Sequence, residues 1–242
     1  MSVLAIEGLT KSFGGFTAVD DVSLRIEPGE LRGLIGSNGA GKSTLLHLIY
    51  GKLEADGGTI QFDGSDVSRL PAHVRARKGM GLVFQLTSVF DALTVEENLM
   101  LGALPKKPRT RLSVDREDVE RIMALLELND VRYRHASQLS HGRQQWLEIG
   151  MVLLTKPTLL LLDEPTSGMT RAESRHTAEM LKQLQATQAT DAIVVVEHNI
   201  EFIRLVSDRV TVMHRGQVLA DGTIDEVQAN SEVQASFLGR LN

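Results

Sequence analysis

A glycine-rich segment at residues 36–44, GSNGAGKST, constrains the possible folds of this chain more than any other feature. It matches the phosphate-binding pattern G-x-x-x-x-G-K-[ST]. The apolar run Leu31–Ile35 precedes it, and apolar residues follow it at helical spacing, at Leu45, Leu46 and Ile49. A strand, a glycine loop and a helix in this order direct backbone N–H groups and a helix N-terminus at one phosphate. The sequence therefore predicts a nucleotide-binding site.

Each residue type in this loop has a physical reason. Glycines allow left-handed backbone angles and a close approach to phosphate oxygens. Lys42 carries positive charge to the β- and γ-phosphates, and the Ser43 hydroxyl is an oxygen ligand of the kind that Mg²⁺ prefers. The alternative is a glycine-rich turn with an unrelated lysine, which the flanking strand and helix disfavour. The predicted nucleotide-binding residues are Gly36, Ser37, Asn38, Gly39, Ala40, Gly41, Lys42, Ser43 and Thr44.

Composition limits the other possibilities. The 242 residues suffice for one large α/β domain, and a hydrophobic content of 42% with 24% charged residues is ordinary for a globular protein. The absence of cysteine excludes disulfides, thiol catalysis and cysteine-bound zinc. A net charge of −5 disfavours a broad nucleic-acid surface, so no nucleic-acid partner is expected.

No apolar run approaches the ~18 residues typical of a membrane span. The first residues, Met1–Glu7, lack the basic region and the long apolar stretch of a signal peptide. We therefore expect a cytoplasmic protein, which would meet a membrane only through a partner.

The chain divides into three blocks. The first, to about Val83, alternates short strands and turns, and its strands at Leu24–Ile26 and Thr59–Phe62 predict a small antiparallel sheet beside the nucleotide core. The second, from about Leu86 to Thr155, is helical, with apolar residues at helical spacing at Val119, Ile122, Met123 and Leu126. Within it, the basic, proline-containing stretch Lys106–Arg109 predicts an exposed loop.

The third block returns to alternating strands and helices. Leu159–Leu162 and Ile193–Val196 are continuous apolar runs, as buried parallel strands require. A helical pattern at Ala172–Leu184 lies between them. Two final strands are predicted at Val210–Met213 and Gln217–Leu219.

Two acids, Asp163 and Glu164, directly follow the strand at 159–162. Acids at the C-terminal end of a strand fit a ligand site at the edge of a parallel sheet. Asp163 can support Mg²⁺, and Glu164 can polarise a water that attacks the γ-phosphate. The alternative is a pair of surface acids that begins a turn before Pro165, and the phosphate loop argues against it.

With these motifs the chain resembles the nucleotide-binding subunits of ABC transporters over nearly its whole length. The resemblance implies that Phe13 stacks on adenine, that Gln85 senses Mg²⁺ and the membrane subunit, and that His198 is the switch histidine. It also implies that Glu164 is the catalytic glutamate. Taken alone, Phe13 is a packing residue, Gln85 a solvated amide and His198 a structural histidine; only their spacing from the two phosphate motifs favours a role. The matching motifs, in chain order, are Phe13, residues 36–44, Gln85, the signature segment 139–143 (LSHGR), Asp163, Glu164 and His198.

The resemblance implies an α/β fold, a P-loop NTPase (RecA-like) core with an antiparallel β subdomain and an inserted α-helical subdomain. Residues 1–242 form a single ABC ATPase domain in this reading. Residues 1–85 and 156–242 make the nucleotide-binding core with its β subdomain, and residues 86–155 make the helical subdomain. The implied cofactors are ATP and Mg²⁺, with Lys42, Glu164 and His198 catalytic and with Ser43, Gln85 and Asp163 at the metal.

The signature segment departs from the Leu-Ser-Gly-Gly-Gln of the family, because His141 replaces the first glycine and Arg143 the glutamine. Ser140 and Gly142 remain as nucleotide-binding residues, and Ser140 can cap a helix that begins near Gly142. Arg143 either adds positive charge near the nucleotide or faces solvent. Thr170 stands where many members have aspartate, which leaves the usual hydrogen bonds across the dimer open.

Both departures are similar to the urea-importer branch of the branched-chain amino-acid type, as are residues 139–150, 168–170 and 195–199. The resemblance implies an ATP-hydrolysing subunit that drives an importer of urea, short amides or branched-chain amino acids. Its partners would be integral-membrane permease subunits, bound near residues 93–98, and a second ATPase subunit, the same or paralogous, in an ATP-sandwich dimer. It would lie on the inner face of the cell membrane.

Three alternatives remain open. The first is the ATPase of an exporter, such as a lipopolysaccharide exporter. The second is a regulatory ABC module whose altered signature segment has lost hydrolysis, against which the retained Lys42, Glu164 and His198 argue. The third is an ABC ATPase of DNA repair or translation, which a single compact cassette with acidic charge disfavours.

Overall fold

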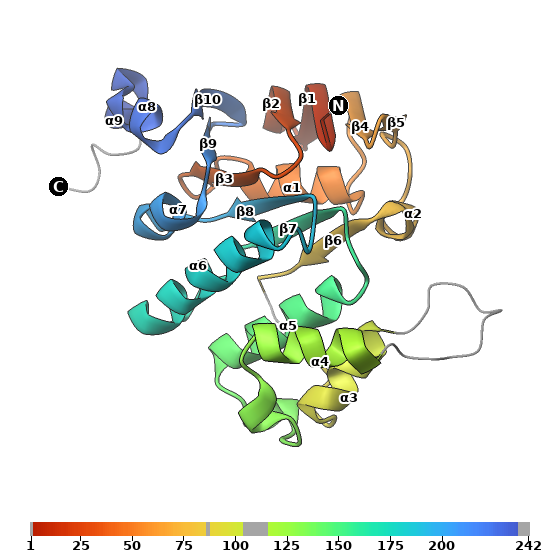
Figure 1. The fold of residues 1–242 in the computed structure, drawn as a ribbon. Coiled ribbons are helices and arrows are strands. Elements are labelled where there is room, and N and C mark those ends of the chain that lie inside the picture. The colour runs from red at the N-terminus through yellow and green to blue at the C-terminus, as the bar shows by residue number, and fades with distance from the viewer. Residues whose placement is uncertain (1, 86–87, 104–115, 237–242) are drawn as a thin grey trace.

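The computed structural model describes residues 2–85, 88–103 and 116–236, and its strands form two sheets in separate layers (Figure 1). The first sheet is antiparallel, with the strand order β2-β1-β4-β5. Its strands are β1 (Leu4–Phe13), β2 (Phe16–Ile26), β4 (Gly57–Phe62) and β5 (Ser65–Asp66). We call it the antiparallel sheet.

The second sheet, called here the core sheet, has the order β10-β9-β3-β8-β7-β6. The strands β9, β3, β8, β7 and β6 are parallel, and β10 joins the edge antiparallel to β9. The bounds are β3 (Leu31–Gly36), β6 (Met80–Val83), β7 (Leu159–Asp163), β8 (Ala192–Val196), β9 (Arg209–His214) and β10 (Gln217–Gly222).

Three helices form a group apart from the core sheet, below it in Figure 1. They are α3 (Val95–Gly102), α4 (Arg116–Leu125) and α5 (His141–Leu153), with short 3-10 turns at Asn129–Val131 and Ala136–Gln138. The other helices lie along the core sheet or, for the last two, beside its edge strand β10: α1 (Lys42–Tyr50), α2 (Ala72–Lys78), α6 (Arg171–Ala186), α7 (Ile200–Val206), α8 (Ile224–Ala229) and α9 (Ser231–Ser236).

Strand β7 shows how the core sheet separates two hydrophobic cores. Its four leucines are all fully buried, and successive side chains of a strand point to opposite faces. Leu160 and Leu162 belong to the core that includes the helices α3, α4 and α5. Leu159 and Leu161 belong to the core between the core sheet and the antiparallel sheet, around α1. A sheet buried on both faces needs continuous apolar strands, which is the pattern in the sequence.

The predicted strands of the core sheet are confirmed, and the helix predicted at 172–184 is α6. The strand at Leu24–Ile26 is the end of the longer β2, and Thr59–Phe62 lies in β4. The predicted loop at Lys106–Arg109 lies outside the described residues. The division into residues 1–85, 86–155 and 156–242 stays a proposal.

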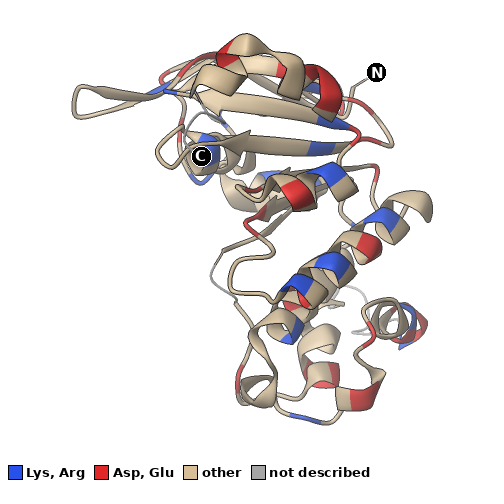
Figure 2. Ribbon diagram, turned by 90° about the vertical axis from the view of Figure 1, so that its left-hand side faces the viewer, with Lys and Arg blue, Asp and Glu red and all other residues tan. Residues whose placement is uncertain are grey.

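Within the described residues, no helix combines the length and the apolar character needed to cross a membrane. Acidic and basic residues occur together in both sheet layers and in the helical group of the described chain (Figure 2).

Candidate nucleotide site

The predicted phosphate loop connects β3 to α1, as the sequence indicates. A cavity of about 230 Å³ lies against it, lined by residues 38–44 and by Glu164. Helix α1 starts after Gly41, and no side chain caps its first turn. The free N–H groups of an uncapped helix N-terminus attract anions, so this cavity suits a phosphate.

Two glycines of the loop are required by the protein's own packing. A Cβ atom on Gly36 would lie 2.3 Å from the backbone oxygen of Met213 in β9. A Cβ atom on Gly41 would lie 2.2 Å from the backbone oxygen of Ala18 in β2, and Gly41 has a φ of 102°. These glycines therefore let the loop pack between the two sheets. By contrast, no atom lies within 4 Å of a Cβ built on Gly39, so that position is open.

The Lys42 ammonium group lies within the loop, only 6% exposed. Its Nζ donates hydrogen bonds to the carbonyl oxygens of Gly36 at 2.8 Å and Ser37 at 3.2 Å. Burial lowers the pKa of Lys42, and the nearby carboxylates of Glu164 and Asp163 oppose that shift. The loop thus holds the Lys42 ammonium group in place, and a charged donor of this kind is what phosphate binding requires.

Two of the predicted metal ligands lie together. The Ser43 hydroxyl donates to Asp163 Oδ1 at 3.4 Å, and Asp163 is 6% exposed. Burial raises the pKa of Asp163, and the charge of Glu164 raises it further. A hydroxyl and a buried carboxylate are a fitting donor set for Mg²⁺, because a divalent cation offsets the charge that burial disfavours. Gln85, the third predicted ligand, instead donates from Nε2 to Glu164 Oε2 at 2.9 Å.

No group of three or more His, Cys, Asp or Glu side chains in the described part of the chain is arranged to hold a metal ion. Mg²⁺ keeps several water or phosphate oxygens when it binds to proteins, so one or two protein ligands suffice. The residues present therefore fit a metal that arrives with a nucleotide.

The Glu164 carboxylate faces the loop from an unusual backbone conformation. Its φ is 47°, in the left-handed region that costs a non-glycine residue about 1 kcal/mol. The Glu164 N–H donates to the Val196 oxygen at 2.9 Å, which ties the turn after β7 to the end of β8. His198, at the end of that neighbouring strand, lies with Nδ1 3.9 Å from Glu164 Oε1. The three residues predicted to be catalytic, Lys42, Glu164 and His198, therefore surround one region.

A third acid of this region, Glu197, was missed in the sequence. It is fully buried and accepts hydrogen bonds from Thr166 N at 3.0 Å and from the Thr166 hydroxyl. It also accepts from the His198 N–H at 3.1 Å. Glu197 thus fixes the segments after β7 and β8 to each other. The sequence did contain a signal for Glu197: like Asp163, it is an acid that directly follows an apolar strand.

The remaining predicted residues do not line the 230 Å³ cavity. Ser140 caps α5, accepting from the Arg143 N–H at 3.4 Å, and Gly142 is buried in the first turn. Arg143 Nη1 pairs with Asp130 Oδ2 at 2.8 Å, so Arg143 lies against its own helical group. Phe13 is 44% exposed at the end of β1, where a stacking partner could reach it, and Lys11 Nζ lies 5.5 Å from its ring centre.

A phosphate loop between a strand and a helix, with an acid pair at the end of another parallel strand of the same sheet, defines a P-loop nucleoside-triphosphatase. Residues 19–167 match the family model described as "ABC transporter". The chain belongs to this family, and it is an ABC-type ATPase.

Curated relatives cover the chain nearly end to end. The high-affinity branched-chain amino acid transport ATP-binding protein BraF of Pseudomonas aeruginosa is 34% identical, over 98% of this chain and 98% of BraF. The lipopolysaccharide export system ATP-binding protein LptB of Haemophilus influenzae is 33% identical, over 99% of this chain and 98% of LptB.

Solved structures confirm the predicted fold class. The ADP conformation of MJ1267, an ATP-binding cassette of an ABC transporter, superposes with a TM-score of 0.87 at 30% identity, over 99% of each chain. The dimeric, post-hydrolysis state of the cassette MJ0796, bound to ADP and phosphate, gives a TM-score of 0.80 at 26% identity, over 91% of this chain and 98% of that one.

Proposed function

We propose that this chain is the ATP-hydrolysing subunit of an importer of branched-chain amino acids, urea or short amides. The similarity to BraF supports the amino acids, and residues 139–150 and 168–170 support urea or amides. The observation that carries the ATPase role is the Glu164 carboxylate in the wall of the phosphate-loop cavity. The protein would act at the inner face of the cell membrane, bound to permease subunits.

In this proposal the residues of the cavity bind and orient ATP. Backbone N–H groups of residues 36–44 and the Lys42 ammonium hold the β- and γ-phosphates, and Phe13 stacks on the adenine. Glu164 accepts a proton from the attacking water, while Gln85 and His198 hold its carboxylate in position. Mg²⁺, held through Ser43, Asp163 and Gln85, would offset charge on the phosphates. The N–H and ammonium groups stabilise the charge that grows on the transferred phosphoryl group.

Ser140 and Gly142 would serve a nucleotide bound to a second ATPase subunit. Both lie outside the cavity of their own chain, at the N-terminus of α5, which favours an anion. The dimeric structure of MJ0796, which this chain resembles, supports such an arrangement. The second subunit would be a copy of this chain or a paralogue.

The helical group would supply the surface for a permease subunit around residues 93–98. Thr94 begins α3 there with a capping box. Two exposed apolar side chains lie close to this segment in the sequence, Phe90 at 53% and Leu101 at 37%. Exposed apolar side chains of this kind are available for an apolar contact with a membrane subunit.

The catalytic assignment predicts distinct effects for two substitutions. Glu164→Gln keeps the shape of the site and should retain ATP binding, while turnover falls about a hundredfold or more with the loss of the proton acceptor. Lys42→Ala should weaken ATP binding about tenfold or more, because a charged hydrogen-bond donor is lost. Steady-state ATP hydrolysis and equilibrium nucleotide binding measure the two effects.

Glu179→Gln is the control for these variants, because Glu179 is an exposed acid on α6 away from the cavity. Normal turnover in Glu164→Gln would remove Glu164 from its role. Unchanged ATP affinity in Lys42→Ala would contradict the phosphate-loop assignment. Absent turnover in the unmodified chain, with ATP binding intact, would favour a regulatory module.

The similarity to LptB favours a second candidate, the ATPase of a lipopolysaccharide exporter. The ATPase chemistry would be the same, so the two candidates differ only in the membrane subunits. Purification of the chain from membranes, followed by mass spectrometry of the bound subunits, distinguishes an importer permease from an exporter.

A further inference from the structure

Glu173, in the first turn of α6, contacts the signature segment of the same chain. Its Oε2 accepts hydrogen bonds from the N–H and the hydroxyl of Thr170, both at 2.9 Å. Its Oε1 accepts from the Ser140 hydroxyl at 3.5 Å. One carboxylate therefore caps its own helix and also reaches the residue that caps α5.

Packing at Gly142 shows the same approach independently. A Cβ atom on Gly142 would lie 3.0 Å from Glu173 Oε1 and 3.2 Å from Glu173 Cδ. Nearby, a Cβ atom on Gly168 would lie 3.3 Å from the His141 ring. The segment that leads from β7 into α6 thus covers the start of α5 at two points, and two of the three positions where this chain departs from the family pattern, 141 and 170, take part.

The carboxylate of Glu173 is ionised at neutral pH. Hydrogen bonds from Thr170 lower its pKa most, and Ser140 and the charge of His141 contribute. A helix N-terminus stabilises a negative group, so Glu173 occupies the kind of environment at α5 that would favour a phosphate. A carboxylate and a phosphate repel each other, and the single proton of the Ser140 hydroxyl is donated to one acceptor at a time.

We propose that Glu173 is a positioning residue that holds the Ser140 hydroxyl in the free subunit and releases it to the γ-phosphate of a nucleotide on a second ATPase subunit. This inference rests on the ATP-sandwich dimer of the proposed function. Glu173 then sets the ATP concentration at which the two subunits close, because the Ser140 hydroxyl must leave Glu173 before it can donate to the phosphate. In the free subunit it keeps the signature segment in one conformation.

Glu173→Gln tests this inference. The glutamine oxygen can still accept from Thr170, so the cap of α6 is kept, while the negative charge facing Ser140 is removed. Introduced into the Glu164→Gln variant, it should lower the ATP concentration for half-maximal dimerisation about fivefold, the order expected when the hydrogen bond that holds the Ser140 hydroxyl is lost. Glu179→Gln, an exposed acid on the same helix, should change it less than twofold.

Dimerisation is measured by light scattering during ATP titration, for the full chain alone and together with any ATPase subunit that co-purifies with it. In a Ser140→Ala background, the added Glu173→Gln should have less than a third of its effect, because the shared hydroxyl is gone. Thermal unfolding of Glu173→Gln checks that the variant folds.

The outcomes separate the two levels of the proposal. Dimerisation with equal ATP dependence in Glu173→Gln and Glu179→Gln, or an unchanged Glu173→Gln effect in the Ser140→Ala background, overturns the role of Glu173 alone. Dimerisation in none of the variants, with ATP binding intact, overturns the sandwich dimer and the inference with it. A lower ATP concentration for half-maximal dimerisation in Glu173→Gln, with less than a third of this effect in the Ser140→Ala background, supports the role of Glu173 and the sandwich dimer.

Discussion

At the scale of single residues, Glu148 is a carboxyl group inside the protein, only 4% exposed on α5. Backbone N–H groups of Ser88 and Phe84 donate to it, and its Oε2 has no hydrogen-bond partner among the described residues. Burial raises the pKa of Glu148 to about 7. The Glu148 side chain thus links α5 to the residues that follow β6, close to Gln85 in the sequence. The linking carboxyl group changes charge near neutral pH.

The raised pKa of Glu148 predicts a pH-dependent stability. Between its ordinary pKa of 4.5 and the folded value of about 7, the folded protein binds a proton that the unfolded chain has lost. The free energy of unfolding therefore falls as pH rises through this window, by about 3 kcal/mol in total, and then levels off. Glu148→Gln removes this dependence, so its stability relative to the unmodified protein should increase from pH 5 to pH 8.

Urea unfolding at several pH values measures this difference. Glu179→Gln serves as the control, because Glu179 is an exposed acid on the surface of α6. A constant difference between Glu148→Gln and the unmodified protein across this pH range would show that Glu148 ionises normally.

At the scale of elements, three helices begin in the same way. The threonines Thr94, Thr170 and Thr223 cap α3, α6 and α8, and in each case a glutamate three residues later completes a capping box. The box satisfies N–H groups that the helix itself leaves without partners. The short helices α3 and α8 need such local support most, because their packing areas are small.

Thr94→Ala should therefore lower the free energy of unfolding by about 1 kcal/mol. ATP affinity of the isolated chain should stay the same, because α3 lies in the helical group and does not line the phosphate-loop cavity. Thr223→Ala removes the equivalent cap of α8 at the C-terminal edge and is the matched comparison. Denaturant unfolding and nucleotide titration give both quantities; a loss of ATP affinity in Thr94→Ala would show that the helical group supports the site directly.

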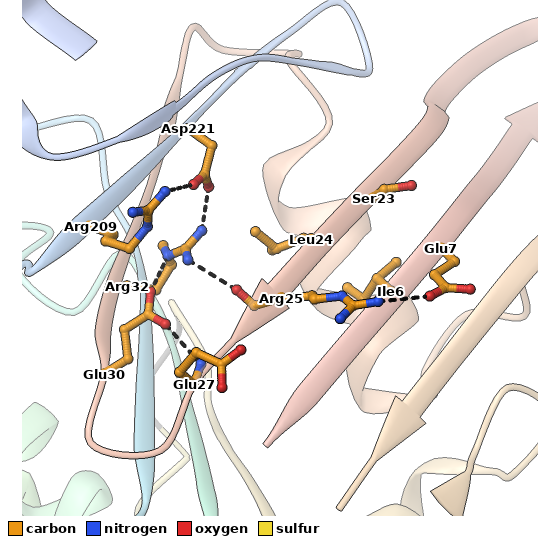
Figure 3. Close-up of a pocket in the computed structure, with 10 residues that line it drawn as sticks. All are labelled: Ile6, Glu7, Ser23, Leu24, Arg25, Glu27, Glu30, Arg32, Arg209 and Asp221. Carbon is orange, nitrogen blue, oxygen red and sulfur yellow. Dashed lines mark hydrogen bonds and ion pairs between the residues drawn. The ribbon is translucent and has the colours of Figure 1, made fainter. Parts of the chain in front are cut away.

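At the scale of the whole molecule, a buried arginine joins the two sheets (Figure 3). Arg32 in β3 is 3% exposed; it pairs with Glu30 and Asp221 and donates to the Thr211 hydroxyl at 2.8 Å. It also donates to the Arg25 carbonyl of the antiparallel sheet at 3.0 Å. A cavity of about 530 Å³ is bordered by Arg25, Glu30, Arg32 and Asp221, at the end of β3 opposite the phosphate loop.

Arg32→Met should destabilise the protein by about 3 kcal/mol or more, because it leaves the buried carboxylate of Glu30 without its partner. The control is Arg25→Ala, whose guanidinium pairs with Glu7 at the surface and should contribute less than about 1 kcal/mol. Denaturant unfolding measures both. A loss in Arg32→Met no larger than that in Arg25→Ala would mean that the sheets are held by apolar contacts alone.

The sequence predicted features whose cause is local. Spacing within 36–44 indicated the phosphate loop, and continuous apolar runs indicated the buried core strands. The strand β1 was missed, because register shifts between Ile6 and Ser12 disturb its alternation of inward and outward side chains. Helices α2 and α7 are too short for a clear helical period.

The sequence by itself determined that the phosphate loop, the acid pair after β7 and the serine of the signature segment are present. Residue type and spacing along the chain suffice for each. Only the tertiary structure decided which groups they meet: Glu197 with Thr166, Glu173 with Ser140, and Arg32 with Asp221. Such partners lie tens to hundreds of residues apart, so no local pattern records them. Glu197 and Thr166 come together because parallel strands bring their C-terminal ends to one edge. Arg32 and Asp221 pair because burial leaves each charge few partners.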